Sequence, residues 1–438
     1  MGLRDLVVFG IVFFALPFVF KRPWVGVMLW TWLAYMNPHR QAWGPAYEFP
    51  FSMLVGLVTI ATFLMTRDKN RMIWTRETIT LSIFIAWMFF TTQFAFFPDL
   101  AALQWNKVWK IHLMIFIIIL LIRDKAQLNW MVWVVALSLG YYGVKGGIFT
   151  IVHGGQFRVQ GPAGTFIGGN NEMALALVML IPLIRYLHLQ AERNWVRLGL
   201  SGAMVLTGVA AIGSQSRGAL VAMALMGLFL LMKSRKKGIM MVYMGIAIAL
   251  IVTIMPQEWR DRMNTIETYQ EDASALGRIN AWHTAFNVAK DRITGGGYEM
   301  FQAPVFRQYA PEPYRVHDVH SIYFEQIGEQ GFIGFGLWFA LGIFTWLRAR
   351  QVIRACKNDP ERKWAADLAA MIQVSMVGYA AGGAFLGLSY WDMPYHLMAI
   401  MLLTAKFAGV LETAPTPVRE PAIGQDRRPV QPFGSRFP

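Results

Sequence analysis

The sequence predicts an all-α, polytopic integral membrane protein with about 12 transmembrane helices and one long helical loop on the outer face. Three observations favour this class over a soluble globular one. Of the 438 residues, 55% are hydrophobic and 14% are aromatic. The mean hydropathy is +0.40. The apolar residues form long runs rather than an alternating pattern, as expected of membrane-spanning helices.

Each candidate span comes close to the roughly 20 residues that cross a bilayer. The spans are expected at residues 5–20, 24–36, 50–66, 78–97, 111–122, 128–143, 172–187, 197–213, 218–232, 238–255, 322–347, 366–388 and 394–411. Residues 25–36 are too few to span comfortably, so we expect one re-entrant or tilted piece beside the true crossings. The first span runs directly into Lys21 and Arg22 without a small-residue cleavage site, and we therefore expect no cleavable signal.

Lysine and arginine gather in every second loop, which predicts that those loops are cytoplasmic. They lie at residues 21–22, 67–76, 123–125, 193–197, 233–237 and 348–363. Alternation then puts the long loop at 256–320 and the turn at 213–220 on the outer face. We expect one membrane domain over residues 1–412 and a disordered cytoplasmic tail over 413–438, which is rich in proline and charge. Topology accounts for most of the net charge of +14, which gives no reason to infer nucleic-acid binding.

Two arginines on the outer side are not explained by the orientation rule. Arg217, in GSQSRGAL, lies between two apolar runs with no carboxylate nearby in sequence. An ionisable group at membrane depth is costly and usually faces a cavity or a partner. Arg278 begins an amphipathic helix predicted to about residue 290, where the helix dipole favours phosphate. We interpret both as ligands of an anion. A distant carboxylate partner for Arg217, and a plain surface helix at Arg278, are the alternatives.

Other polar residues are expected on the same outer face. Arg158 and Arg315 are further cations that the orientation rule does not explain, and local pairing with acids is their alternative role. Asp392, in GLSYWDMPYH, is the carboxylate expected to reach the site, where it would orient a histidine or pair with an arginine. Capping of the helix that follows is its alternative role.

The stretch HDVHSIYFEQIGEQGFIG places His317 and His320 at the outer boundary of a predicted span. In a helix both rings would share one face, as a metal site needs. Catalytic zinc sites take three protein ligands, however, and Asp318 and Glu325 fall at no recognised ligand spacing. A structural histidine is the second possibility. We favour His320 as a general base, because a neutral imidazole can take a proton from a hydroxyl at physiological pH. We expect no metal.

Four segments together resemble the O-antigen ligase and O-antigen polymerase superfamily. HSIYFEQIGEQGFIG, residues 320–334, resembles its histidine motif, with Ser321, Gly331 and Gly334 in the other fixed places. SQSRGA, and GRINAW with the GGGYEMF turn, resemble its two arginine-bearing blocks in the same order. GPAGTFIGGNNEMALALVMLIPL, residues 161–183, is similar to its asparagine block, in the version of exosortase-associated O-glycosylation ligases. The resemblance spans roughly residues 160–400.

Members of this superfamily move a glycan from an undecaprenyl pyrophosphate carrier to an acceptor hydroxyl on the periplasmic side, without nucleotide sugar or metal. The resemblance therefore implies a multi-pass enzyme of the bacterial inner membrane that needs no cofactor. Arg217 and Arg278 would stabilise the leaving pyrophosphate, and His320 would accept the proton of the attacking hydroxyl. A single displacement would invert the anomeric configuration, since no pair of facing carboxylates argues for retention.

The remaining expected substrate-binding residues are Arg158, Asn171, Arg315, His317 and Asp392. The favoured acceptor is the lipid A-core oligosaccharide. A protein Ser or Thr, or a growing glycan chain, would use the same donor, and the outer loops carry no readable acceptor code. A transporter of the lipid-linked glycan is the alternative of another class. It would not need a histidine beside two arginines, and the sequence shows no internal repeats.

Overall fold

The structure, a computed structural model, describes residues 2–233, 238, 241, 245, 257 and 273–411. Over these residues every regular element is a helix, which confirms the all-α fold class. The helices are α1 (Leu3–Lys21), α2 (Trp24–Met36), η1 (Pro38–Gln41), α3 (Phe51–Met65), α4 (Arg76–Thr92), α5 (Pro98–Leu121), α6 (Lys125–Val152), α7 (Asn170–Gln190), α8 (Asn194–Gly213), α9 (Arg217–Lys233), α12 (Ala273–Asp291), α13 (Ala303–Tyr309), α14 (Ile322–Cys356), α15 (Lys363–Gly383) and α16 (Asp392–Phe407).

Six helices in the described residues are long and apolar enough to cross a membrane: α1, α5, α6, α7, α8 and α14. Two shorter apolar helices are α3 and α9. These helices support a multi-pass membrane protein, while about 12 crossings stays a prediction. The span expected at 238–255 and the tail expected at 413–438 lie outside the described residues.

Several helices extend beyond the apolar runs from which they were predicted. α5 begins at Pro98, well before the span expected at 111–122, and α14 runs to Cys356 rather than ending near residue 347. Hydropathy marks only the part of a helix that is apolar. Lys107 and Lys110 lower it within α5, and Arg348 and Arg350 lower it within α14. Arg348, Arg350 and Arg354, which we expected in a loop after residue 347, are therefore helical.

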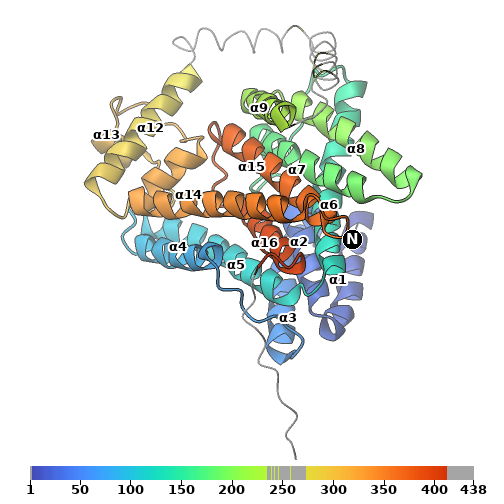
Figure 1. Ribbon diagram of the computed structural model, residues 1–438. Helices are drawn as coiled ribbons and strands as arrows, with labels where there is room; N and C mark the ends of the chain where they lie inside the picture. Colours follow the sequence, from blue (N-terminus) through green and yellow to red (C-terminus); the bar gives the residue numbers. More distant parts are fainter. Residues whose placement is uncertain are drawn as a thin grey trace, which may run out of the picture.

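α14 runs through the middle of the molecule, with α4 along one side and α15 along the other (Figure 1). α12 and α13 lie at the end where α14 begins. Among the described helices α16 is the most enclosed, and the side chains of its residues 397–405 are all buried. α12 (Ala273–Asp291) covers the residues where the amphipathic helix was expected, but the chain is already helical from Ala273, so Arg278 does not begin the helix as predicted.

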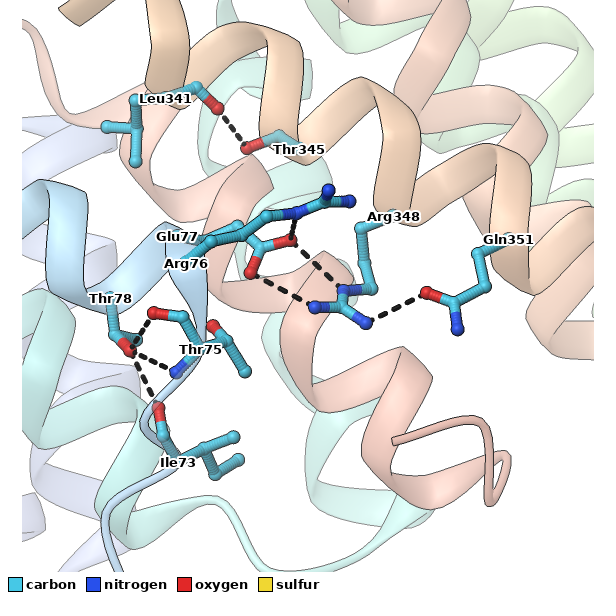
Figure 2. Close-up of polar contacts among 9 residues, drawn as sticks. All are labelled: Ile73, Thr75, Arg76, Glu77, Thr78, Leu341, Thr345, Arg348 and Gln351. Atoms are coloured by element: carbon cyan, nitrogen blue, oxygen red, sulfur yellow. Dashed lines mark hydrogen bonds and ion pairs between the residues drawn. The ribbon is translucent and has the colours of Figure 1, made fainter. Parts of the chain in front are cut away.

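A buried ion pair joins α4 to the far end of α14 (Figure 2). Glu77 is fully buried, and its two carboxylate oxygens accept hydrogen bonds from Arg348 Nε at 3.0 Å and Nη2 at 3.2 Å. Arg348 Nη1 also donates to Gln351 at 2.8 Å. Such a forked contact fixes both the distance and the angle between two helices. It lies about 40 Å along α14 from the first residue of that helix.

The turn that follows α12 packs against a break in α14 at Gly331. Gly331 has φ 67° and ψ −179°, so the carbonyl groups just before it lose helical partners. The carbonyl of Gly328 accepts from Gly296 N–H at 2.8 Å, and that of Glu329 accepts from Gly297 N–H at 2.9 Å. A side chain at Gly331 would come within 2.3 Å of the Ile293 carbonyl oxygen. Glycine is therefore required here by both conformation and space.

Candidate functional site

The arginine block, residues 277–282 in the first half of α12, packs directly against the histidine loop, residues 310–321. The ring of His317 lies over Gly277, where a Cβ atom would approach its Cδ2 to 2.6 Å. Arg278 lies close enough to His320 for its charge to act on the imidazole. The structure thus brings together two motifs that are separated by about 40 residues in sequence.

Hydrogen bonds and a small apolar cluster hold this contact. Asn280 bonds the histidine loop at the backbone of Glu312 and Arg315. The Trp282 indole N–H donates to the Val319 carbonyl at 2.8 Å, and its ring stacks on Phe324 at 5.0 Å. The apolar cluster contains Ala281, Trp282, Phe301, Phe306, Ala310, Val319 and Phe324. Both the arginine block and the histidine loop contribute side chains to this cluster.

His320 sits just before α14 in a backbone conformation with φ 40°, which residues other than glycine rarely adopt. Its Nδ1 lies 3.4 Å from Asp318 Oδ2, and its side chain is 27% exposed, so one part of the ring stays reachable. Burial lowers the pKa of His320 below its ordinary value of 6.5. The Asp318 carboxylate raises that pKa, whereas Arg278 and His317 lower it. The imidazole is therefore mainly neutral at pH 7.

Arg217 is the first residue of α9 and follows a turn whose serines, Ser214 and Ser216, are buried. Gly218 lies against the α15–α16 turn, where its Cβ position is 3.3 Å from Phe385 Cβ. Ile322, the residue that starts α14, packs against Gly383, the last residue of α15. The end of α15 and the turn that follows it therefore contact both the helix start that carries Arg217 and the helix start beside His320.

A second connection runs through residues 169–172, at the start of α7. Asn170 Nδ2 donates to the Ser214 carbonyl at 2.9 Å, which ties this segment to the turn before Arg217. Glu172 lies close enough to Arg278 and Asp318 to interact with both electrostatically. Glu172 was not among the predicted site residues, although it follows the asparagines of the same block. Only the folded chain shows that it faces Arg278.

The other predicted residues lie at varied distances from this site. Arg158 Nε donates to Gln215 at 3.4 Å, so it lies beside the turn before Arg217. Arg315 is paired with Glu312 at 3.1 Å, which is the local pairing that was its alternative role. Asn171 is half-buried beside Asn170, and it is Asn170 whose amide reaches the Ser214 carbonyl.

The carboxylate that the structure places beside His320 is Asp318. A role for Asp392 at this site stays a prediction. Asp392 is 5% exposed in the first turn of α16 and lies near Tyr35 of α2. Sequence reasoning linked Asp392 to the site through topology alone. It overlooked Asp318 because a residue two positions from His320 reaches the ring only when the backbone bends as it does here.

No group of three or more His, Cys, Asp or Glu side chains in the described part of the chain could hold a metal ion. The rings of His317 and His320 meet edge to face at 5.4 Å. His317 Nδ1 lies 2.7 Å from the Asp318 carbonyl, while His320 Nδ1 faces the Asp318 carboxylate. The Nδ1 atoms of the two rings thus face different oxygens of Asp318.

An apolar cavity of about 320 Å³ is lined by α14, α15 and α16, with Met179 of α7. Its α14 lining includes Ile322 and Tyr323, two and three residues after His320, and continues to Trp346. The lining includes Trp338, Leu341, Met376, Tyr379, Leu397 and Met398. A polar, basic corner and an apolar cavity therefore adjoin at one helix start.

Comparison with known families agrees with this arrangement. A family model described as O-Antigen ligase matches residues 202–339, a range that contains Arg217, Arg278 and His320. This match over about a third of the chain supports membership in the O-antigen ligase superfamily. Residues 3–191 match a model described as a family of unknown function, DUF5935. No curated protein matches the chain. Membership in the O-antigen ligase superfamily indicates a glycosyltransferase of the ligase or polymerase type.

Proposed function

We propose that this protein transfers O-antigen polysaccharide from undecaprenyl pyrophosphate to the lipid A-core oligosaccharide, on the periplasmic face of the bacterial inner membrane. The observation that carries the proposal is the packing of the arginine block on the histidine loop. It puts a guanidinium, a mainly neutral imidazole and the Asp318 carboxylate at one helix start. These are the groups that a displacement at a sugar pyrophosphate needs.

In the proposed reaction the acceptor hydroxyl approaches Nε2 of His320. Its proton moves to that nitrogen while its oxygen forms a bond to the anomeric carbon of the glycan. The bond between that carbon and the pyrophosphate oxygen breaks, and the electron pair leaves with the pyrophosphate. Attack from the face opposite the leaving group inverts the anomeric configuration, as in other single displacements at a sugar.

The growing charge on the leaving pyrophosphate is the part of the reaction that Arg278 and Arg217 would stabilise. A guanidinium can bind two phosphate oxygens at once. Arg278 lies near the proposed base, and Arg217 begins α9, which packs on α15. Because this stabilisation is stronger in the transition state than in the bound donor, it raises the rate and not only the affinity.

The apolar cavity between α14, α15 and α16 supports a donor with a lipid tail. Its lining is almost entirely hydrophobic and includes Ile322 and Tyr323, two and three residues after His320. A polyisoprenoid bound there would leave its pyrophosphate at the basic corner. A nucleotide sugar has no apolar part that this cavity would take up.

The acceptor is tested by reconstitution of the full chain in lipid nanodiscs with an undecaprenyl pyrophosphate-linked glycan. Separate reactions contain lipid A-core oligosaccharide, a Ser- and Thr-containing protein, or no added acceptor. We expect transfer to the lipid A-core alone. Modified protein would instead identify a protein O-oligosaccharyltransferase, and longer lipid-linked glycan a polymerase. Transport is measured separately, with the protein reconstituted in proteoliposomes. Movement of the donor across their membrane without glycan transfer would contradict the proposal and identify a transporter.

A further inference from the structure

We infer that Trp282 and Asn280 are positioning residues, which hold the peptide groups that set the orientation of the His320 imidazole. The inference rests on the proposed role of His320 as the base. On α12, Asn280 follows Arg278 by two residues and Trp282 follows it by four. They therefore tie the position of His320 to the helix that carries a proposed phosphate ligand.

Trp282 acts on the peptide group that directly precedes the His320 Cα atom. The Val319 carbonyl and the His320 N–H belong to one planar group, so its rotation changes φ of His320. The Trp282 indole donates to that carbonyl at 2.8 Å. Val319 N–H donates to Asp318 Oδ1 at 2.7 Å. Both backbone polar groups of Val319 therefore have defined partners.

The backbone of His320 needs such support because its φ is 40°. A histidine in this region persists only where the surrounding structure holds it. Trp282 contacts both sides of the bend, since its ring also stacks on Phe324 with an interplanar angle of 8°. Without the indole N–H, the peptide group before His320 could rotate towards a more common conformation.

Asn280 fixes the beginning of the same loop. Its Nδ2 donates to the carbonyls of Glu312 and Arg315, each at 2.9 Å, and its Oδ1 accepts from Glu312 N–H at 2.9 Å. The residue is 3% exposed, so water cannot easily replace these bonds. All the polar atoms of this side chain are thus used to hold the histidine loop on α12.

The experiment compares Trp282→Phe and Asn280→Ala with two matched controls in nanodiscs, using the full chain and an undecaprenyl pyrophosphate-linked glycan. Trp87→Phe removes an indole bond of the same length, to the Gln330 carbonyl at the break in α14. Asn287→Ala removes a 2.9 Å amide bond from the same helix to Tyr309. The readouts are kcat, the KM for the donor, the pH dependence of kcat, and the thermal unfolding midpoint.

We expect Trp282→Phe and Asn280→Ala each to lower kcat by about fivefold, the equivalent of one hydrogen bond, with the KM for the donor unchanged. The acidic limb of kcat should move to higher pH, because a looser loop exposes the ring and removes the burial that lowers its pKa. The controls should shift the unfolding midpoint alone.

The inference would be overturned if both test variants had the kcat of the wild type and the same pH dependence of kcat. The same holds if both test variants behave like the controls. The two variants are independent, so one decides the question if the other does not fold. Full transfer by His320→Ala would instead count against the proposed base, which separates failure of the positioning role from failure of the proposed function.

Discussion

Asp318 Oδ2 lies 3.4 Å from Nδ1 of His320. A carboxylate at that nitrogen favours the tautomer with the proton on Nδ1, which leaves Nε2 with the lone pair. Nε2 is then the nitrogen that can accept a proton from an acceptor hydroxyl. The pairing of carboxylate and imidazole thus assigns different roles to the two nitrogens of one ring.

The first prediction is that His320→Ala abolishes transfer while His317→Ala is milder. The His320→Ala variant lacks the proton acceptor of the proposed mechanism. The His317 side chain, in contrast, contacts the site through its ring and its packing on Gly277. Transfer is measured in nanodiscs, and donor binding and thermal unfolding are measured for each variant. If His320→Ala transfers glycan as fast as the wild type, the histidine is not the base.

The second prediction concerns the pH dependence of kcat. Only neutral His320 can accept a proton, so activity should fall as the pH drops through its pKa, which burial holds below 6.5. Asp318→Asn removes the charge that raises this pKa. The acidic limb should therefore move to lower pH, and kcat should fall by about tenfold as the orientation of the ring is lost.

The control for this prediction is Glu312→Gln, which removes another carboxylate of the histidine loop. Glu312 pairs with Arg315 and not with His320, so the limb should stay in place. Arg278→Gln removes a charge that lowers the pKa of His320, and its limb should move to higher pH. If kcat of Asp318→Asn and of the wild type fell at the same acidic pH, Asp318 would not act on the titrating group.

Much of the site was accessible from the sequence, because its motifs are contiguous. Arg278 and His320 each stand in a short recognisable block, and both blocks contain the residues that join them, such as Trp282 and Val319. What the sequence could not supply was the partner of each residue. Asp392 was the carboxylate expected to reach the site, and Asp318 was considered only as a metal ligand, because only the bend at His320 places Asp318 against the ring.

The fold could be predicted as far as apolar runs reveal it. α5 was expected to begin at residue 111, because Lys107 and Lys110 interrupt its hydropathy, yet it begins at Pro98. The break in α14 was also not foreseen. Gly331 occupies a fixed place of the histidine motif, but its role depends on Ile293 and the glycine turn that dock there. Long-range contacts of this kind leave no periodic pattern in a sequence.

The third prediction separates charge from geometry at the two arginines. Arg217→Ala and Arg278→Ala should each slow transfer by at least about tenfold, because a charge-assisted contact to phosphate contributes about 1.5 to 3 kcal/mol. Lysine keeps the charge but loses the planar fork. Arg217→Lys and Arg278→Lys should therefore recover only part of the rate. Full activity of either lysine variant would show that charge alone is sufficient at that position.

The fourth prediction is that an excess of chelator leaves the transfer rate unchanged. The proposed reaction uses guanidinium groups where other transferases use a metal ion. The rate is measured with the full chain before and after dialysis against the chelator, with and without added zinc or magnesium. A loss of activity that zinc restores would favour a metal site at His317 and His320.

The fifth prediction concerns stability and not catalysis, and it uses the ion pair at the far end of α14. Glu77→Ala leaves the Arg348 guanidinium, whose side chain is 11% exposed, without its buried carboxylate. Breaking such a pair costs about 3 to 5 kcal/mol, so the thermal unfolding midpoint in detergent should fall clearly. The double variant Glu77→Leu with Arg348→Met should recover most of this loss, because apolar side chains of similar volume need no partner there. In both variants the transfer rate per folded molecule should equal that of the wild type, since His320 lies about 40 Å away along the helix. A rate that falls while the midpoint stays constant would mean that this end of α14 communicates with the site.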